Sequence, residues 1–354
     1  MSDEISPAEQ LEGLMLESGW TVLRKIERLK GQTGGHFSVG YLARNDAGEL
    51  AFLKALDFSQ ALQSDDLFAA LDEAIGSFRF EIEMLEMCAG QGMTHVVRAL
   101  DSGFVRVDAG PLGRVPFLLF EPAEGDVRKA ISSFGFVDRN WAIALMHEVA
   151  VGLQQLHLAQ LAHQDLKPSN VLTYESGKQF KISDLGCASL KGRGCPRDGM
   201  RVPGGWSVAP PELQYGQLSS DWLVRRVAAD LYALGSLGVF LFTGLSMNAV
   251  VRQHIADGKD CVSWLGTYKE VFPFVRDAYE KAFEEIAACF SDPVSADLLL
   301  ILKELCEPDP ELRGSPAHRG SLFEQYSVQR YVSRLALLSR RVAYAERKIV
   351  RNGG

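Results

Sequence analysis

The sequence predicts an α+β chain with two lobes, the first rich in strands and the second mostly helical. Its 354 residues, 47% of them hydrophobic, are enough for a large core and for more than one domain. Residues 20–56 read as strands, whereas apolar residues beyond position 127 recur at helical spacing. We expect an N-terminal segment at 1–18, a first lobe at 19–121, a second lobe at 122–325 and a helical tail at 326–354.

The composition argues against several classes of protein. A formal net charge of -8 disfavours a nucleic-acid-binding surface, which is normally basic. The six cysteines are scattered without CxxC or Cys/His zinc spacing, which predicts reduced thiols without disulfides or structural zinc. The N-terminus lacks the apolar region of a signal peptide, and the longest apolar run, of about 12 residues, is too short to span a bilayer. We therefore expect a cytoplasmic protein with no nucleic-acid or membrane partner.

A helix is expected at residues 64–88, opened by the cap-like Ser64-Asp65-Asp66. The apolar residues that follow recur at helical spacing and form one stripe, which consists of Phe68, Leu71, Ile75, Phe78, Ile82 and Leu85. Glu81 flanks this stripe. Two further strands are expected at 95–107 and 114–121, before a connector that ends at residue 126.

Lys54 stands between two apolar residues at the end of a strand. One interpretation is a lysine whose aliphatic stem packs while its ammonium reaches water. The other is an anion site, because Gly31, Gly34 and Gly35 just upstream let backbone N–H groups gather around a negative charge. A bound phosphate would account for both features.

A group of polar residues follows the first long helix of the second lobe. That helix is expected at 139–161, and the segment "AHQDLKPSNVLTY" at 162–174 leads from it into an apolar strand. One interpretation is an ordinary turn, where Asp and Asn are common. The order and spacing of four residues favour a chemical site instead: Asp165, Lys167, Asn170 and Asp184.

These segments resemble the eukaryotic-type protein kinases. The family's catalytic loop, H-R-D-L-K-x-x-N, is matched by "HQDLKPSN" at 163–170, and its metal motif, D-F-G, by "DLG" at 184–186. "AFLK" stands for V-A-I-K, "FRFEIEML" for the helix that supplies a glutamate, and "APPEL", "ADLYALGSLG" and "DPELR" for three later motifs. All follow the family's order across residues 20–320, so the resemblance implies a bilobal protein-kinase-like fold with a β-rich N-lobe and an α-helical C-lobe.

The resemblance also implies ATP and Mg²⁺ as cofactors. Lys54 would hold the α- and β-phosphates and Glu81 would orient it, while Asn170 and Asp184 would bind Mg²⁺ through oxygen atoms. The other nucleotide contacts that it implies are Gly34, Gly35 and Phe37 in the glycine-rich loop and Phe120, Glu121 and Ala123 in the connector.

Other matching residues imply roles at the acceptor side and in the fold. Asp165 would accept the proton of a substrate hydroxyl, and Lys167 resembles the lysine with which serine/threonine kinases neutralise the γ-phosphate. Glu212 and Arg313 match a buried ion pair, and Asp230 matches a carboxylate that braces the catalytic loop.

Three motifs depart from the family pattern. In the glycine-rich loop, Gly35 keeps the second glycine, whereas Thr33 and Ser38 replace the first and third and Gly40 replaces a valine. Gly205 stands where serine/threonine kinases have a threonine. Either Ser207 replaces that threonine or the substrate peptide is positioned differently.

The third departure is Gln164, which replaces an arginine that binds phosphate in kinases switched on by phosphorylation. Segment 184–212 contains no threonine or tyrosine, only Ser189 and Ser207. We therefore expect activity without phosphorylation of this segment, and control through the tail helix or a partner.

The tail beyond residue 326 carries a heptad-like repeat. Val328, Leu335, Val342 and Ile349 form one row, and Tyr331, Leu338 and Ala345 form a second. Two interpretations follow: a tail helix packed on the second lobe, or a helix that binds a regulatory partner or forms a dimer.

The sequence thus favours ATP- and Mg²⁺-dependent phosphoryl transfer to serine or threonine in a protein substrate. A pseudokinase or nucleotide-binding interaction module is one alternative, motivated by the irregular glycine-rich loop. A small-molecule phosphotransferase is another, although it should lack "APPEL" and "DPELR", and both are present.

Overall fold

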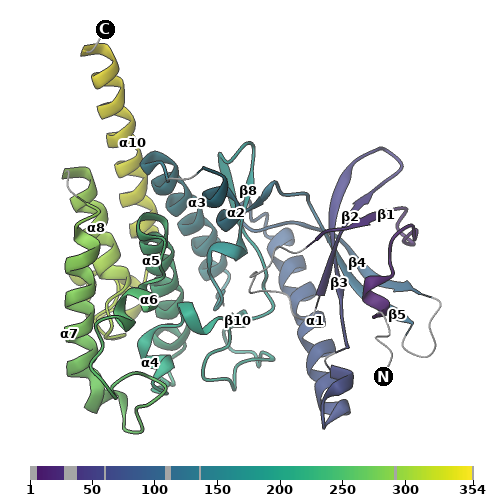
Figure 1. The fold of residues 1–354 in the computed structure, drawn as a ribbon, viewed down its shortest axis with the longest axis horizontal. Helices are drawn as coiled ribbons and strands as arrows, with labels where there is room; N and C mark the ends of the chain where they lie inside the picture. Colours follow the sequence, from purple (N-terminus) through teal and green to yellow (C-terminus); the bar gives the residue numbers. More distant parts are fainter. Residues whose placement is uncertain are drawn as a thin grey trace. The chain divides into compact units, whose positions relative to one another are not determined.

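The computed structural model describes residues 6–27, 38–59, 61–107, 113–134, 137–290 and 293–352. The chain forms two compact units, Met1–Glu124 and Gly125–Gly354. The first contains a five-stranded sheet and one long helix, and the second is mainly helical (Figure 1). This segregation of strands and helices confirms the predicted α+β class.

The sheet of the first unit is antiparallel throughout, with strand order β1-β2-β3-β5-β4. Its strands are β1 (Thr21–Lys25), β2 (Ser38–Arg44), β3 (Leu50–Leu56), β4 (Ala99–Arg106) and β5 (Arg114–Phe120). In β3 the residues Ala51, Leu53 and Ala55 are fully buried, and the alternate residues are only partly buried. The pleat therefore gives this central strand two different faces.

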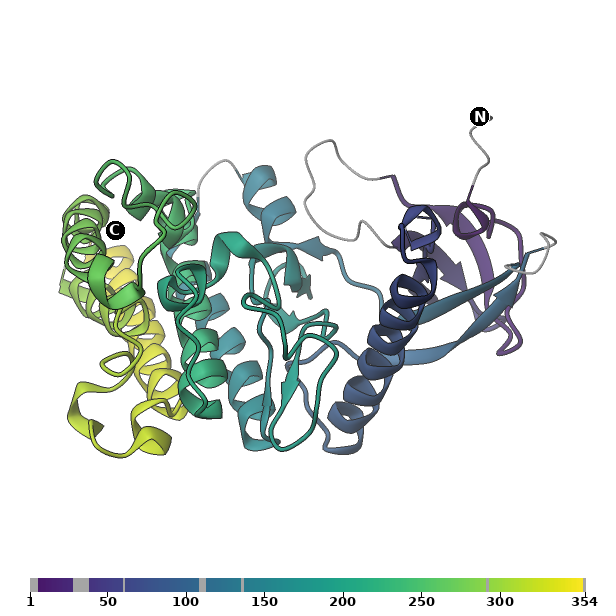
Figure 2. The same ribbon diagram turned by 90° about the horizontal axis from the view of Figure 1, so that it is seen from below.

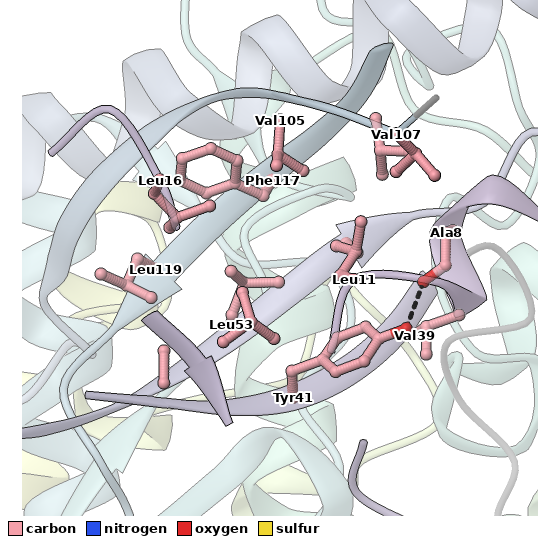
Figure 3. Packing of buried hydrophobic residues seen from close by; sticks show 14 of the residues in the cluster. Ala8, Leu11, Leu16, Val39, Tyr41, Leu53, Val105, Val107, Phe117 and Leu119 are labelled. Carbon is pink, nitrogen blue, oxygen red and sulfur yellow. Dashed lines mark hydrogen bonds between the residues drawn. The ribbon is translucent and has the colours of Figure 1, made fainter. Parts of the chain in front are cut away.

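The N-terminal residues join the core on the Leu53 face of this sheet. Ala8, in the 3₁₀ turn η1 (Pro7–Glu9), and Leu11 and Leu16 pack in the same cluster as Tyr41 and Leu53 (Figure 3). The Tyr41 hydroxyl donates a hydrogen bond of 2.6 Å to the carbonyl of Ala8, and burial raises the pKa of this phenol to about 12. Residues 6–20 are thus built into the first unit.

Helix α1 (Leu67–Gly90) begins after Asp66, whose carboxylate accepts a hydrogen bond from the Ala69 amide. Figure 2 shows it as one long helix. The predicted helix is confirmed, but the predicted stripe is buried only in its second half. Phe78 is buried and packs edge-on against Phe104 of β4, whereas Phe68 is 83% exposed. The periodicity identified the helix, but it could not show where packing against the sheet begins.

The second unit is built around α3 (Arg139–Leu158) and α5 (Ala228–Thr243). Its other helices are α2 (Val127–Phe134), α4 (Pro211–Gln214), α6 (Met247–Arg252), α7 (Tyr268–Ala287), α8 (Pro293–Leu305), α9 (Leu322–Gln325) and α10 (Gln329–Asn352). Short strands β6 (Gly125–Asp126), β8 (Val171–Tyr174) and β9 (Gln179–Ile182) form one sheet, and β7 (Leu161–Ala162) pairs with β10 (Ser189–Leu190).

A π-helical turn, η5 (Leu223–Val227), leads directly into α5. The combined helix Leu223–Thr243 is long and apolar enough to cross a membrane, but 83% of its most apolar window is buried inside the structure. Its apolar character is therefore explained by its position in the core of the second unit.

The tail forms α10, which packs along α3 and also contacts α8 (Figure 1). Its buried residues follow the predicted rows: Val328, Tyr331, Leu335, Leu338 and Val342. The side chains of the next two repeat positions lie outside the described residues. Up to Val342, the face considered for dimerisation is thus covered by helices of the same chain.

Candidate functional site

The first unit places Lys54 against Glu81. Strand β3 turns Lys54 away from the Leu53 face, and Glu81 lies in the buried half of α1. The Lys54 Nζ atom donates to both carboxylate oxygens at 3.0 Å, and the two side chains are only 22% and 7% exposed. A carboxylate this close favours the charged form of the ammonium, so an ion pair forms at this partly buried position.

Gly40 lies opposite Lys54 in the β2–β3 register. A Cβ atom at Gly40 would stand 3.0 Å from the ring of Phe52, which occupies the space that a side chain there would need. Gly40 therefore stands where the family has a valine because the Phe52 ring fills the space that a valine side chain would need. Gly34, Gly35 and Phe37 lie outside the described residues.

The connector residues lie at the end of β5. Phe120 is buried and its ring centroid lies 6.4 Å from that of Phe52. Glu121 accepts a hydrogen bond of 2.9 Å from the Arg98 amide, and its own amide donates to the Arg98 carbonyl. Ala123 follows, half-buried. Glu121 thus joins the end of β5 to the backbone of Arg98.

In the second unit, three of the predicted residues meet on the loop between β7 and β8. The Asp165 carboxylate is buried, and its Oδ2 atom accepts hydrogen bonds from Lys167 Nζ at 2.7 Å and Asn170 Nδ2 at 3.0 Å. Asn170 Nδ2 also donates to the Asp165 carbonyl at 2.9 Å. The loop therefore holds one carboxylate beside one ammonium and one amide.

Asp230, at the start of α5, holds this loop in place through hydrogen bonds to its backbone. Its carboxylate is fully buried and accepts hydrogen bonds from the backbone amides of His163 and Gln164 at 2.7 and 2.8 Å. Burial alone would raise the pKa of Asp230, but the hydrogen bond from His157 and the other contacts outweigh it and lower the pKa. Asp230 thus stays a carboxylate and fixes the backbone just before Asp165.

His163 links this loop to the residue before Asp184. Its Nε2 atom lies 3.0 Å from the Ser183 carbonyl, and the Asp165 amide donates to its Nδ1 atom at 3.1 Å. One neutral tautomer, with the proton on Nε2, satisfies both contacts. His163 therefore serves here as a structural link between the two segments.

Asp184 follows directly, with a left-handed backbone at φ 67°. The Ser183 amide donates to the Asn170 carbonyl at 2.9 Å, which ties the Asp184 segment to the loop. Asn170 points its Nδ2 group toward Asp165. Its Oδ1 atom and the Asp184 carboxylate are therefore the oxygen atoms suited to bind a metal ion. Such oxygens suit Mg²⁺, which takes few protein ligands and completes its shell with water and phosphate.

The loop before α4 approaches Asp165 through a pair of glycines. The Gly205 amide donates to Asp165 Oδ1 at 2.6 Å. A Cβ atom at Gly204 would lie 2.3 Å from the Gln164 carbonyl, so only glycine fits there. Ser207, the candidate to replace the missing threonine, is exposed. The hydrogen bond to Asp165 comes from the backbone amide of Gly205. The double glycine was a signal for this contact that the sequence analysis missed.

Glu212 and Arg313 form a buried ion pair. Two parallel hydrogen bonds of 2.8 Å join the guanidinium to the carboxylate, and Arg313 also donates to the carbonyls of Glu307 and Ala228. Burial would lower the pKa of Arg313, but Glu212 raises it, so the arginine stays charged. The pair ties the segment around α4 to the chain beyond α8.

Comparison with known proteins gives consistent matches. The Protein kinase domain family matches residues 29–324. The serine/threonine-protein kinase PknL of Mycobacterium tuberculosis is 25% identical over 337 residues, which cover 90% of this chain and 75% of that protein. Cyclin-dependent kinase B2-1 of Arabidopsis thaliana is 32% identical over 231 residues, which cover 62% and 68%. The serine/threonine-protein kinase AfsK of Streptomyces coelicolor is 29% identical over 212 residues, which cover 59% of this chain but 23% of that protein.

Proposed function

The chain belongs to the protein kinase domain family, of the serine/threonine class represented by its relatives, and on this premise we propose that it transfers the γ-phosphoryl group of ATP to protein hydroxyls. Mg²⁺ is the proposed cofactor, and serine and threonine are the proposed acceptors. Lys167 supports this choice of acceptor, because it is the residue that serine/threonine kinases place beside the catalytic aspartate.

The placement of Asp165 carries the proposal. A carboxylate offers about four lone-pair positions. Among the described residues, three donors, from Gly205, Lys167 and Asn170, occupy positions on Asp165, which leaves one position for a substrate hydroxyl. Asp165 would align that hydroxyl and take its proton as the oxygen attacks phosphorus, while Lys167 would neutralise charge on the transferred group.

The first unit contains the proposed phosphate and adenine contacts, and the second contains the proposed Mg²⁺ ligands. Lys54, kept charged by Glu81, is suited to the α- and β-phosphates, and Asn170 and Asp184 are the proposed Mg²⁺ ligands. Bound Mg²⁺ would supply neutralisation of phosphate charge. Phe120, Glu121 and Ala123 remain the proposed contacts of the adenine.

The two alternative functions make different predictions. A pseudokinase would not need the Lys54–Glu81 ion pair, which is formed here at 3.0 Å. A small-molecule phosphotransferase would not need the ion pair between Glu212 of "APPEL" and Arg313 of "DPELR". This pair is also formed. Both pairs favour protein phosphorylation. A cytoplasmic location is proposed on the six unpaired cysteines alone.

Phosphate transfer tests the proposal directly. Purified protein incubated with γ-labelled ATP and Mg²⁺ should label itself or serine and threonine residues of a mixture of protein substrates. EDTA should abolish the transfer, because phosphate charge would no longer be neutralised. Label on small molecules only would support the phosphotransferase, and no label on any acceptor would contradict the proposal.

Nucleotide binding provides a second, separate test. ATP with Mg²⁺, at about 100-fold above its Kd, should raise the melting temperature by about 4 °C, since it binds only the folded state. Asp184→Ala should remove most of the Mg²⁺-dependent part of this shift. Differential scanning fluorimetry with ATP alone, with Mg²⁺ alone and with both would measure it. A shift identical in wild type and Asp184→Ala would contradict the role of Asp184.

A further inference from the structure

Asp198 lies at the centre of a hydrogen-bond network in the segment that follows Asp184. Its Oδ1 atom accepts hydrogen bonds of 3.0 Å from the Ser189 hydroxyl and from Arg226 Nη2. Its Oδ2 atom accepts a bond of 2.9 Å from the Cys195 amide. Its carbonyl accepts two more, from Arg225 and Arg226. Asp198 thus joins two residues of its own segment, Ser189 and Cys195, to the helical turn η5 before α5.

Arg226 carries this network to the catalytic loop. Its Nη1 atom donates to the side-chain oxygen of Gln164 at 3.3 Å, and the Gln164 amide group donates back to the Arg226 carbonyl at 2.9 Å. Gln164 immediately precedes Asp165 and holds a left-handed backbone at φ 66°. The chain of contacts therefore runs from Asp198 through Arg226 and Gln164 to Asp165.

The difference in burial between Arg226 and Asp198 shows which of the two charges depends on the other for stabilisation. The Arg226 side chain is 3% exposed, whereas Asp198 is 34% exposed. Burial and the neighbouring Arg225 lower the pKa of Arg226, and Asp198 raises it. A buried guanidinium without a carboxylate would be costly, so Asp198 is the group that lets Arg226 stay charged and in place.

We propose that Asp198 is a positioning residue for phosphoryl transfer: a carboxylate of the chain itself that orders this segment through Arg226 and Gln164. It would do without modification what a phosphate does in kinases that require phosphorylation here. The inference deepens the proposed function and rests on it.

The state of Ser189 agrees with this role. It is one of two hydroxyl residues in segment 184–212, is 3% exposed, donates to Asp198 and accepts a hydrogen bond from Trp222 Nε1. A modifying enzyme could not reach this hydroxyl without opening the network. With Ser189 unphosphorylated, its hydroxyl is therefore a part of the network around Asp198.

Substitutions at Asp198 test the inference. Asp198→Asn keeps the shape but removes the charge, and kcat should fall about tenfold because Asp165 is less well positioned. The KM for ATP should stay unchanged, since Asp198 has no proposed contact with the nucleotide. Asp198→Glu should restore most of the rate, because its partly exposed site has room for one methylene group. Asp277→Asn is the matched control: it removes an exposed carboxylate on α7 and should leave kcat unchanged.

Hydrogen exchange gives a readout that does not depend on activity. Amides of residues 187–201 should exchange faster in Asp198→Asn than in wild type, while α7 should not change. If Asp198→Asn fails to fold, Asp198→Asn/Arg226→Gln removes both charges and should show the same slower kcat and faster exchange.

The outcomes separate this inference from the proposed function. Wild-type kcat in Asp198→Asn, or a slower kcat without faster exchange in 187–201, would overturn the inference. Full activity of phosphatase-treated wild type, verified unmodified by mass spectrometry, is expected, and loss of that activity would also overturn it. If wild type transfers no phosphate at all, the proposed function fails, and the exchange data alone then decide whether Asp198 orders the segment.

Discussion

Asp165→Asn is expected to lower the rate of phosphoryl transfer by about a hundredfold or more, with the fold unchanged. Asparagine has the same shape as aspartate but cannot take a proton, and it brings no negative charge to Lys167. The asparagine oxygen can keep the contact of Asp165 Oδ1 with the Gly205 amide, whereas its NH₂ group cannot accept the hydrogen bonds from Lys167 and Asn170.

The measurement is the initial rate with labelled ATP and Mg²⁺ at saturating protein substrate, together with the melting temperature. Lys54→Met and Asp184→Asn should show losses of similar size, because each removes a charge that would contact the phosphates or Mg²⁺. A substitution at the exposed Asp277 serves as the control. Wild-type turnover in Asp165→Asn would show that another group is the catalytic base.

Arg313→Met is expected to lower the free energy of unfolding by about 3–5 kcal/mol. Arg313 is fully buried, so its removal leaves Glu212 as an uncompensated carboxylate and leaves two backbone carbonyls without their donor. Arg341→Met is the matched control: it breaks an exposed pair with Asp297 and should cost less than about 1 kcal/mol.

Urea unfolding followed by circular dichroism compares the two variants. The double variant Arg313→Met/Glu212→Leu should recover part of the stability, because it removes the second buried charge as well. Equal losses in Arg313→Met and Arg341→Met would show that burial of the pair has no special energetic role.

The sequence predicted those parts of the fold and site that follow local patterns. The resemblance to kinases implied that Glu81 orients Lys54, and the order and spacing of Asp165, Lys167 and Asn170 favoured a shared chemical site. Each of these features depends on residues that belong to a recognised motif.

Other features depend on contacts that no local pattern encodes. Leu11 and Leu16 lie in a segment without helical or strand periodicity, and only the folded sheet shows that they are buried. Phe68 continues the helical stripe in sequence, but its side chain is 83% exposed. Arg226 meets Asp198 from a separate helix, and neither residue belongs to a motif that we recognised.

The N-terminal residues in the sheet core have a practical consequence for fragment design. The family match begins at residue 29, but Ala8, Leu11 and Leu16 cover side chains of the first unit, and the Tyr41 hydroxyl needs the carbonyl of Ala8. A fragment that begins at residue 29 would expose an apolar surface of the sheet and would leave the buried Tyr41 hydroxyl without its hydrogen-bond acceptor. Expression boundaries should therefore follow burial rather than sequence similarity, and should retain the chain from residue 6 onward.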